Sequence, residues 1–198
     1  MIDEKTLSVY SEKADEYAAM SERVDKKDPS LAAFIAAMPE QGRVLDLGCG
    51  PGGCAARMAR TGLQVDALDP VAEMVALAQA HPGVTATQGT FDDLEGSARY
   101  DGIWANFSLL HAPRQDMPSH LARIAEALKQ GGRFHIAVKT GTGSHRDTIG
   151  RLYTYYTETE LTALLADVGL SVIDRREGTS PGLSGELAHW IALAARRD

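Results

Sequence analysis

The sequence predicts an α/β sandwich of three layers, in which a seven-stranded, mostly parallel sheet ends in an antiparallel strand. Between residues 43 and 139, short apolar runs alternate with helix-competent segments of roughly ten residues. This alternation is typical of βαβ units, whose helices cover both faces of a parallel sheet. After residue 169, two apolar runs follow each other with only a glycine-rich turn between them. They predict a hairpin, which places one antiparallel strand at the end of the sheet.

Length and composition indicate one globular domain over residues 1–198. Hydrophobic residues make up 44% of the chain and charged residues 24%, a balance that is typical of folded domains. The formal net charge of −7 disfavours DNA or RNA as a partner, because an acidic surface repels phosphates. No apolar run approaches the ~18 residues of a membrane span, and the first residues lack the pattern of a secretion signal. We therefore expect a cytoplasmic protein with no membrane partner.

Residues 1–40 precede the first strand and are expected to form helices, with apolar and aromatic residues on a shared face. A break at residues 28–30 offers Asp28 or Ser30 as the N-cap of a second, short helix over residues 31–38. Because this segment is not part of the sheet, it can form a lid over a bound cofactor. It can equally be a pair of packing helices, and the two interpretations are compatible.

The expected core covers residues 41–139, and the remaining residues, 140–198, hold a substrate loop and the hairpin. Core strands are expected at 43–48, 64–69, 84–88, 100–106 and 133–139, with helices at 53–61, 71–80 and 117–129, the last ended by Gln130-Gly131-Gly132. After it, we expect a loop over 140–146, a helix over 157–168 with a capping box at its start, strands at 170–176 and 187–194, and a turn over 178–185.

The apolar run at 43–48 breaks into a glycine cluster that predicts a nucleotide-cofactor site. Glycines let the backbone adopt positive φ and approach a ligand closely, and the loop delivers that ligand to the N-terminus of the next helix. Gly48, Gly50 and Gly53 match G-x-G-x-x-G, a weak dinucleotide signal when it stands alone. Asp69 ends the next strand, where an acid can accept hydrogen bonds from both ribose hydroxyls. NAD and S-adenosylmethionine fit these features equally well.

Three further features favour S-adenosylmethionine. Asp46 stands inside the first strand, two residues before the first glycine. A carboxylate there can orient the loop and reach a cationic amino-acid group, whereas it would repel a pyrophosphate. The site begins only near residue 44, after a helical segment, and the chain ends in a hairpin with little room for a second nucleotide-binding half.

Five segments resemble, in order, the motifs of the class I S-adenosylmethionine-dependent methyltransferases, in particular the small bacterial type that acts on small molecules. They are residues 44–52 (Val-Leu-Asp-Leu-Gly-Cys-Gly-Pro-Gly), 65–70 with Met74 after them, 88–94, 100–111 and 128–134. The resemblance implies a Rossmann-like fold and S-adenosyl-L-methionine as cofactor. Two positions depart from the family pattern: Gln130 stands where Pro is usual, and Thr90 stands where Asp is common before the adenine contact.

The resemblance also implies roles by position. Gly48, Cys49, Gly50 and Gly52 form the loop at the methionine end, with Asp46 supporting it. Asp69 holds the ribose, and Pro70, Met74, Thr90 and Phe91 lie beside the adenosine. The backbone carbonyl of Asn106 receives the cofactor ammonium, and Tyr17 closes over the amino-acid end from the lid.

The acceptor is expected to be a small molecule methylated on oxygen or nitrogen, because long insertions that grip a macromolecule are absent. His111 follows the fourth strand and titrates near neutrality, so it is the candidate general base; it can equally be a histidine hydrogen-bonded within its loop. The expected acceptor pocket is lined by His145, Arg146, Tyr153, Tyr155 and Tyr156, although the tyrosines can also be packing residues. Arg146 and Arg151 would suit a carboxylate, and no residues have metal-ligand spacing.

Two other functions remain open from the sequence. The chain can be a cofactor-binding regulator or partner subunit that has lost catalysis, and intact glycine-loop residues predict cofactor binding in that case too. A small NAD-dependent oxidoreductase is the more remote alternative, because no Tyr-x-x-x-Lys pair is present for hydride transfer.

Overall fold

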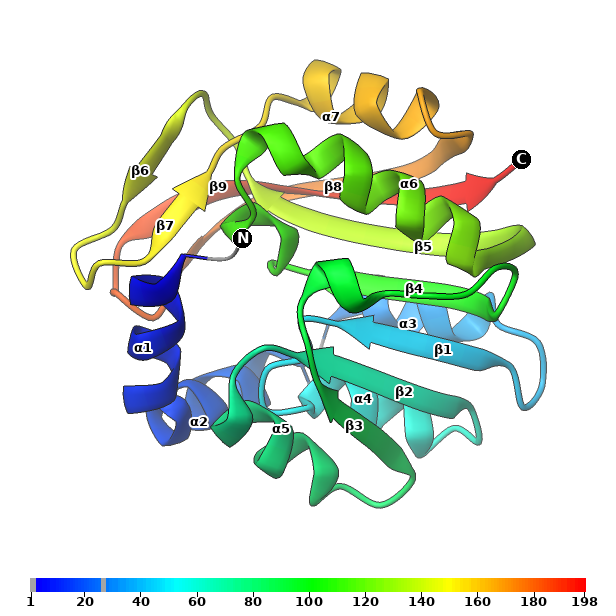
Figure 1. The fold of residues 1–198 in the computed structure, drawn as a ribbon, viewed down its shortest axis with the longest axis horizontal. Helices are drawn as coiled ribbons and strands as arrows, with labels where there is room; N and C mark the ends of the chain where they lie inside the picture. Colours follow the sequence, from blue (N-terminus) through cyan, green and yellow to red (C-terminus); the bar gives the residue numbers. More distant parts are fainter. Residues whose placement is uncertain (1–2, 26–27) are drawn as a thin grey trace.

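A seven-stranded sheet runs through the middle of the molecule, with helices on both of its faces (Figure 1). The computed structural model describes residues 3–25 and 28–198. The strand order is β3-β2-β1-β4-β5-β9-β8; β9 is antiparallel to both neighbours, and the other neighbouring pairs are parallel. The predicted fold class is therefore confirmed, but the antiparallel strand β9 lies between β5 and β8 and not at the edge of the sheet, where it was expected. The strands are β1 (Arg43–Leu47), β2 (Gln64–Asp69), β3 (Val84–Gln88), β4 (Tyr100–Asn106), β5 (Leu128–Lys139), β8 (Leu170–Pro181) and β9 (Leu187–Arg197).

One large apolar cluster lies on each face of the sheet, and a third, smaller one joins α1 and α2 to Val71 and Met74. Successive side chains of a strand point to opposite faces, so Leu45 joins one cluster and its neighbour Val44 joins the other. In the same way Ile103 and Trp104, both fully buried, face opposite layers. The first layer holds α6 (Met117–Ala127) and α7 (Glu158–Ala166), and the second holds α3 (Pro29–Ala36), α4 (Gly53–Ala59) and α5 (Ala72–Gln79). None of the described helices is long and apolar enough to cross a membrane.

The N-terminal segment forms two helices at the carboxyl ends of the parallel strands (Figure 1). Helix α1 (Glu4–Glu12) is capped by Asp3, whose carboxylate accepts from the backbone N–H of Thr6. The chain breaks at Lys13 and continues as α2 (Ala14–Asp25). Helix α3 is capped by Asp28, one of the two candidates. The helical prediction also covered residues 1, 2, 26 and 27, which lie outside the described residues.

The expected loop over residues 140–146 is wrong in part. Residues Ser144–Arg146 form β6, which pairs with β7 (Leu152–Thr154) in a separate two-stranded sheet. The Ser144 hydroxyl donates to the Thr154 hydroxyl across this pair at 3.2 Å. Three-residue strands are too short to show a readable alternation, so the sequence pattern could not reveal them.

Several strand limits also differ from those expected. Helix α6 ends at Ala127 and β5 begins at Leu128, because the chain passes through a bulge in which Gly131 has φ +74°. The pairing resumes its register at Arg133. Strand β8 continues to Pro181, since the turn to β9 is tight: the N–H of Gly182 donates to the carbonyl of Glu186. Short 3-10 helices lie at η1 (Phe91–Asp93), η2 (Leu109–His111) and η3 (Arg114–Asp116).

Candidate functional site

The glycine loop after β1 is held close to the loop after β4. Gly48 has φ +75°, and a Cβ placed on it would lie 2.3 Å from the Cβ of Ser108. The Ser108 hydroxyl donates to the carbonyl of Leu47 at 2.6 Å, which joins the two loops. Gly50 has φ +52° and faces the ring of Tyr17 from α2. Side chains at these two positions would therefore be strained and would fill the space above the loop.

Asp69 ends β2 beside this loop and is buried, with 7% of its surface exposed. One carboxylate oxygen accepts from the N–H of Gly50 at 2.8 Å, and the other accepts from the N–H of Val71 at 3.0 Å. Burial raises the pKa of Asp69 to about 6, and the two backbone hydrogen bonds oppose that rise. Each carboxylate oxygen has further acceptor capacity, so Asp69 can also accept from a ligand's hydroxyl groups.

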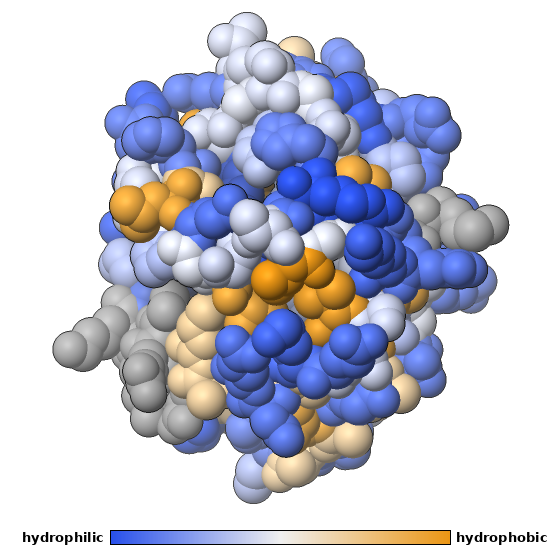
Figure 2. All heavy atoms as spheres, turned by 90° about the vertical axis from the view of Figure 1, so that its left-hand side faces the viewer, coloured by the Kyte–Doolittle hydropathy of each residue, from blue (hydrophilic) through white to orange (hydrophobic). Residues whose placement is uncertain are grey.

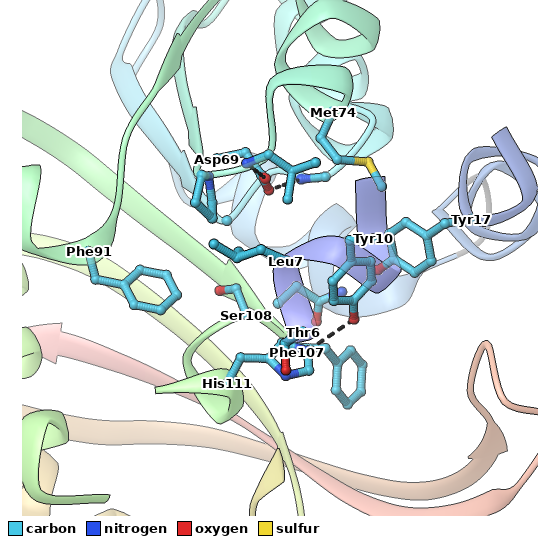
Figure 3. A pocket seen from close by; sticks show the side chains of 15 residues that line it. Thr6, Leu7, Tyr10, Tyr17, Asp69, Met74, Phe91, Phe107, Ser108 and His111 are labelled. Atoms are coloured by element: carbon cyan, nitrogen blue, oxygen red, sulfur yellow. Dashed lines mark hydrogen bonds between the residues drawn. The ribbon is translucent and has the colours of Figure 1, made fainter. Parts of the chain in front are cut away.

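A cavity that we call the cofactor chamber lies over the glycine loop and under α1 and α2. Including its open mouth it encloses about 530 Å³. Figure 3 shows Asp69 and His111 on opposite sides of this space. It is lined by nine predicted site residues (Tyr17, Gly48, Gly50, Asp69, Pro70, Met74, Phe91, Asn106 and His111) and by Thr6, Leu7, Tyr10, Val71, Phe107 and Ser108.

Four predicted cofactor residues lie outside this lining. Asp46 is buried in β1 just before the loop, and Cys49 is buried beside it, where burial raises the pKa of its thiol. Gly52 begins α4 with φ +81° and packs against Ala78. Thr90 caps η1: its hydroxyl donates to the carboxylate of Asp93 at 2.9 Å. The Thr90 side chain thus serves the turn itself, whereas the adjacent Phe91 ring reaches the chamber.

A larger cavity, which we call the second chamber, adjoins the first and encloses about 1040 Å³ including its mouth. Residues of α2, of the β8–β9 turn and of the ends of β5 and β9 line it. Figure 2 looks onto this side of the molecule, where apolar side chains lie among hydrophilic ones near the middle of the face. The two chambers share four lining residues: Tyr10, Tyr17, Asn106 and Phe107.

Phe107 stands at this junction with a left-handed backbone, φ +56°. Such a conformation is strained for a bulky residue, and it persists here because the Phe107 N–H donates to the carbonyl of Ala137 on β5. The Phe107 ring meets Trp190 edge to face, with 6.1 Å between ring centres. This left-handed backbone directs the Phe107 ring into the wall between the two chambers.

Of the five residues expected to line the acceptor pocket, the structure brings only Tyr153 to the second chamber. His145 stacks on Tyr155 along the β6–β7 hairpin, and Arg146 forms an ion pair with Asp3. Tyr156 is fully buried under the guanidinium of Arg114. These four side chains are occupied by contacts that hold the hairpin, α1 and α7 in place.

Lys139 and Trp190 are among the residues of the second chamber that the sequence reasoning missed, and Arg151 was given only a minor role. Lys139 is the one charged residue at the end of the apolar β5 segment Phe134–Lys139, a position at the carboxyl edge of the sheet where ligands bind in such folds. The position of Lys139 could therefore have indicated a ligand-binding role. Trp190 offered no such indication, because an aromatic residue in a strand is ordinarily a packing residue.

His111 is buried, and both of its ring nitrogens have partners. Nδ1 lies 2.7 Å from the carbonyl oxygen of Leu152, and Nε2 lies 2.9 Å from the hydroxyl of Tyr10 (Figure 3). A carbonyl can only accept, so Nδ1 carries the hydrogen and Nε2 of the neutral ring accepts from Tyr10. Burial lowers the pKa of His111 to about 4, although the bond to Leu152 opposes the shift. The ring is therefore neutral near pH 7 and has a basic nitrogen aimed at Tyr10.

Tyr10 also accepts a hydrogen bond from Arg151 at 2.8 Å. Arg151 forms a buried ion pair with Asp147, again at 2.8 Å, so the guanidinium is held in place and its charge is balanced. The Tyr10 hydroxyl thus sits between one donor and one acceptor at the wall that both chambers share.

No group of three or more His, Cys, Asp or Glu side chains that could hold a metal ion occurs among the described residues. Cys49 and Cys54 are free and buried, as expected of small packing residues.

Comparison with known proteins agrees with this site. Residues 44–132 match the family model described as "Methyltransferase domain". The chain is 27% identical to the ubiquinone biosynthesis O-methyltransferase of Xanthomonas axonopodis over 157 residues, which is 70% of this chain and 65% of that protein. It is 34% identical to the trans-aconitate 2-methyltransferase of Deinococcus radiodurans over 138 residues, 67% of this chain and 52% of that protein.

A solved structure is similar over nearly the whole chain. It is the Burkholderia thailandensis 1,6-didemethyltoxoflavin-N1-methyltransferase with bound 1,6-didemethyltoxoflavin and S-adenosylhomocysteine. Its TM-score is 0.72 at 27% identity, with 96% of this chain and 88% of that chain covered.

One class of protein combines these features: a parallel sheet with one antiparallel strand, a glycine loop after the first strand, and similarity to known methyltransferases. Residues 44–132 are a methyltransferase domain, and the chain has the fold of the class I S-adenosylmethionine-dependent methyltransferases, a class whose cofactor is S-adenosyl-L-methionine. The chain spans 65% and 52% of the two curated relatives above.

Proposed function

We propose that this chain transfers a methyl group from S-adenosylmethionine to an oxygen or nitrogen atom of a small molecule held in the second chamber. The observation that carries the proposal is the shared wall formed by Tyr10, Tyr17, Asn106 and Phe107. A donor in one chamber and an acceptor in the other would meet there, as a direct displacement requires.

The cofactor chamber offers groups that suit each part of the cofactor. Asp69 would accept from the ribose hydroxyls, and Met74 and Phe91 would pack beside the adenosine. The backbone at Gly48 and Gly50 would approach the methionine end, with Asp46 supporting the loop from β1. Pro70 borders the adenosine, the carbonyl of Asn106 would receive the ammonium, and Tyr17 would close over the amino-acid end.

When bound, S-adenosylmethionine supplies a methyl group that its positively charged sulfur already activates. The protein's contribution is therefore to orient the acceptor and to exclude water. Such orientation is worth up to ~7–11 kcal/mol in model reactions. The strained Phe107 and the two tyrosines of the shared wall would restrict the acceptor's approach to one direction.

A proton on the acceptor atom would leave through Tyr10. The Tyr10 hydroxyl can take that proton while it passes its own to Nε2 of His111, which is unprotonated near pH 7. Arg151 keeps the Tyr10 oxygen in place during this exchange. A positioned base of this kind contributes typically ~10²–10⁴-fold to the rate.

The relatives support a small acceptor without fixing its identity. Their names include an O-methyltransferase and an N1-methyltransferase, and two of them name small acceptors, trans-aconitate and 1,6-didemethyltoxoflavin. The second chamber is lined mostly by apolar and aromatic side chains with a few polar groups, as small-molecule sites usually are. The net charge of −7 would disfavour a nucleic acid.

A methyl-transfer screen over small carboxylates, amines and phenols tests the proposal, with S-adenosylhomocysteine as the detected product. We expect turnover with at least one class. On the best acceptor, His111→Gln, which preserves a donor and an acceptor, should lower the rate by at least ~10²-fold while cofactor affinity is retained. Unchanged turnover would remove His111 as the base. Cofactor binding without turnover across the panel would favour a regulator or partner subunit.

A further inference from the structure

The second chamber contains a cation, Lys139, that forms no ion pair with any described carboxylate, although the charges of Asp147 and Glu186 act on it from a longer distance. Lys139 ends β5 and has 9% of its surface exposed. Its ammonium nitrogen lies 3.6 Å from the centre of the Tyr153 ring, and no ion pair joins it to any residue that the structure describes. Burial and the nearby Arg151 guanidinium lower the pKa of Lys139. The chamber therefore holds a costly positive charge whose only close partner is an aromatic face.

The other cation of the chamber differs in this respect. Arg151 is paired with Asp147, and both side chains are almost fully buried. The side chains of Arg151 and Lys139 converge on one point: a Cβ on Gly182 would lie 3.8 Å from Nη2 of Arg151 and 4.0 Å from Nζ of Lys139. Glu186, in the same turn, accepts from Ser184, and its charge opposes the fall in the pKa of Lys139 without forming an ion pair with it. Lys139 is thus left as the group that an anionic ligand would neutralise.

The walls around this charge are aromatic. Five of the chain's twelve aromatic residues line the chamber: Tyr10, Tyr17, Phe107, Tyr153 and Trp190. Phe107 and Trp190 meet at 90° and form a corner. The Trp190 ring can occupy this position because Gly178 has no side chain: a Cβ there would lie 2.5 Å from the ring. Aromatic walls favour flat, apolar ligands, which stack or pack against them edge to face.

The cofactor in the adjoining chamber would also bring positive charge close to Lys139. The sulfonium of the bound cofactor would add a second positive charge near Lys139, and the buried Arg151–Asp147 pair adds none. Like charges repel strongly in a chamber shielded from water. A cationic acceptor is therefore disfavoured, and an anionic acceptor would be attracted by both charges.

We propose that the methyl acceptor is an aromatic or heteroaromatic acid, whose ionised group binds the ammonium of Lys139 while its ring packs between Tyr153 and the Phe107–Trp190 corner. This inference rests on the proposed function. In the transfer, a lone pair of the acceptor's oxygen or nitrogen forms the bond to the methyl carbon. The carbon–sulfur bond breaks with its electron pair left on sulfur, and any proton on the nucleophile passes to Tyr10.

The test uses matched pairs of compounds, for which we choose hydroxybenzoates, indole carboxylates and pyridine carboxylates with their carboxamides. Binding to the protein saturated with S-adenosylhomocysteine is measured by calorimetry for the wild type, Lys139→Met and Lys139→Arg. Lys129→Met is the control, because Lys129 lies on the same strand at the opposite edge of the sheet, where it pairs with Asp101. Affinity for S-adenosylhomocysteine is measured separately in each variant.

We expect at least one acid to bind at least ~10-fold more tightly than its carboxamide, since a charge-assisted bond is lost in the amide. Lys139→Met should abolish this preference, Lys139→Arg should retain most of it, and Lys129→Met should leave it unchanged. Lys139→Met should also keep its affinity for S-adenosylhomocysteine. If Lys139 only maintained the fold, its replacement could weaken cofactor binding as well.

Three results would overturn the inference: carboxamides or amines that bind better than the acids, a preference for acids that survives in Lys139→Met, or no acid that binds to the loaded protein. In each case S-adenosylhomocysteine still binds, so the cofactor site stands. Failure of S-adenosylhomocysteine itself to bind would instead contradict the proposed function.

Discussion

Asp69 links the glycine loop to the second strand through one carboxylate. Its two oxygens accept from Gly50 and Val71, so the side chain that would hold the ribose also fixes the loop that would approach the methionine end. Burial opposes its ionised form, which places its pKa at about 6, close to physiological pH. A ligand that donates hydroxyl groups to Asp69 would favour the ionised form and lower that pKa.

We predict that affinity for S-adenosylhomocysteine depends on pH through Asp69. Because hydroxyl groups donate to the carboxylate, the ligand prefers the ionised form, and binding releases a proton near pH 6. Affinity should level off above pH ~7 and fall by up to ~10-fold per pH unit below 6. Calorimetry between pH 5 and 8 measures it.

Two variants control this measurement. Asp69→Asn should weaken binding by at least ~10-fold at pH 7.5 and remove the pH dependence, because the amide does not titrate in this range. Thr90→Ala should have a much smaller effect, since the Thr90 hydroxyl is engaged with Asp93. Equal losses in the two variants would show that the ribose contact is wrongly assigned.

Residues differ in how far sequence alone could define their roles. Asp69 and Gly48 could be placed because spacing along a strand and loop determines where they lie. Arg146 could not, since its partner Asp3 is distant in the sequence and the ion pair depends on how α1 packs. The position of Lys139 at the end of an apolar strand could have been noticed in the sequence, but the lack of an ion pair with any described residue is a property of the folded chamber.

At the scale of elements, α1 and the β6–β7 hairpin form a clasp over the cofactor chamber. We define the clasp by three contacts: Asp3 with Arg146, Thr6 with the N–H of Leu152, and Tyr10 with Arg151. Asp3 both caps α1 and binds Arg146, which holds the pKa of that carboxyl well below its usual range. The clasp connects the lid to the chain between β5 and α7, so the lid and the second chamber are coupled.

We predict that Arg146→Met loosens α1 without unfolding the protein. The Asp3–Arg146 pair is partly exposed, so its loss should cost the folded state little stability. That cost should appear as hydrogen exchange ~2–5-fold faster in the amides of α1 and as a slightly faster release of S-adenosylhomocysteine.

Arg175→Met is the matched control, because Arg175 is similarly exposed and forms ion pairs with Glu158 and Glu177 away from α1. Mass spectrometry of deuterium uptake compares the two variants. If α1 exchanges no faster in Arg146→Met than in Arg175→Met, the clasp does not hold the lid.

Element type followed from sequence more closely than element length. The strands Gln64–Asp69, Val84–Gln88 and Tyr100–Asn106 have the predicted limits, because loops that contain glycine or charged residues bound each apolar run. Strand β8 runs past its predicted end because pairing with β9 extends both strands over polar residues. Cross-strand hydrogen bonds, which no local pattern records, determined that length.

At the scale of the whole molecule, the cofactor chamber could be predicted from the sequence and the second chamber could not. The cofactor chamber is built from consecutive strand–loop–helix units, so the order of motifs along the chain defines most of it. The second chamber is built from α2, the end of β5, the β6–β7 hairpin and the β8–β9 turn. These segments meet only in the folded protein, which is why the proposed acceptor site could not be located from the sequence.

The most direct test of the account is a titration of the purified protein with S-adenosylhomocysteine, with NADH as the competing candidate. Binding to the native state alone raises thermal stability, by ~2.7 kcal/mol when the ligand is present at one hundred times its dissociation constant. We predict saturable binding of one S-adenosylhomocysteine per chain with a matching rise in melting temperature, and no rise with NADH. A rise with NADH and none with S-adenosylhomocysteine would contradict the account.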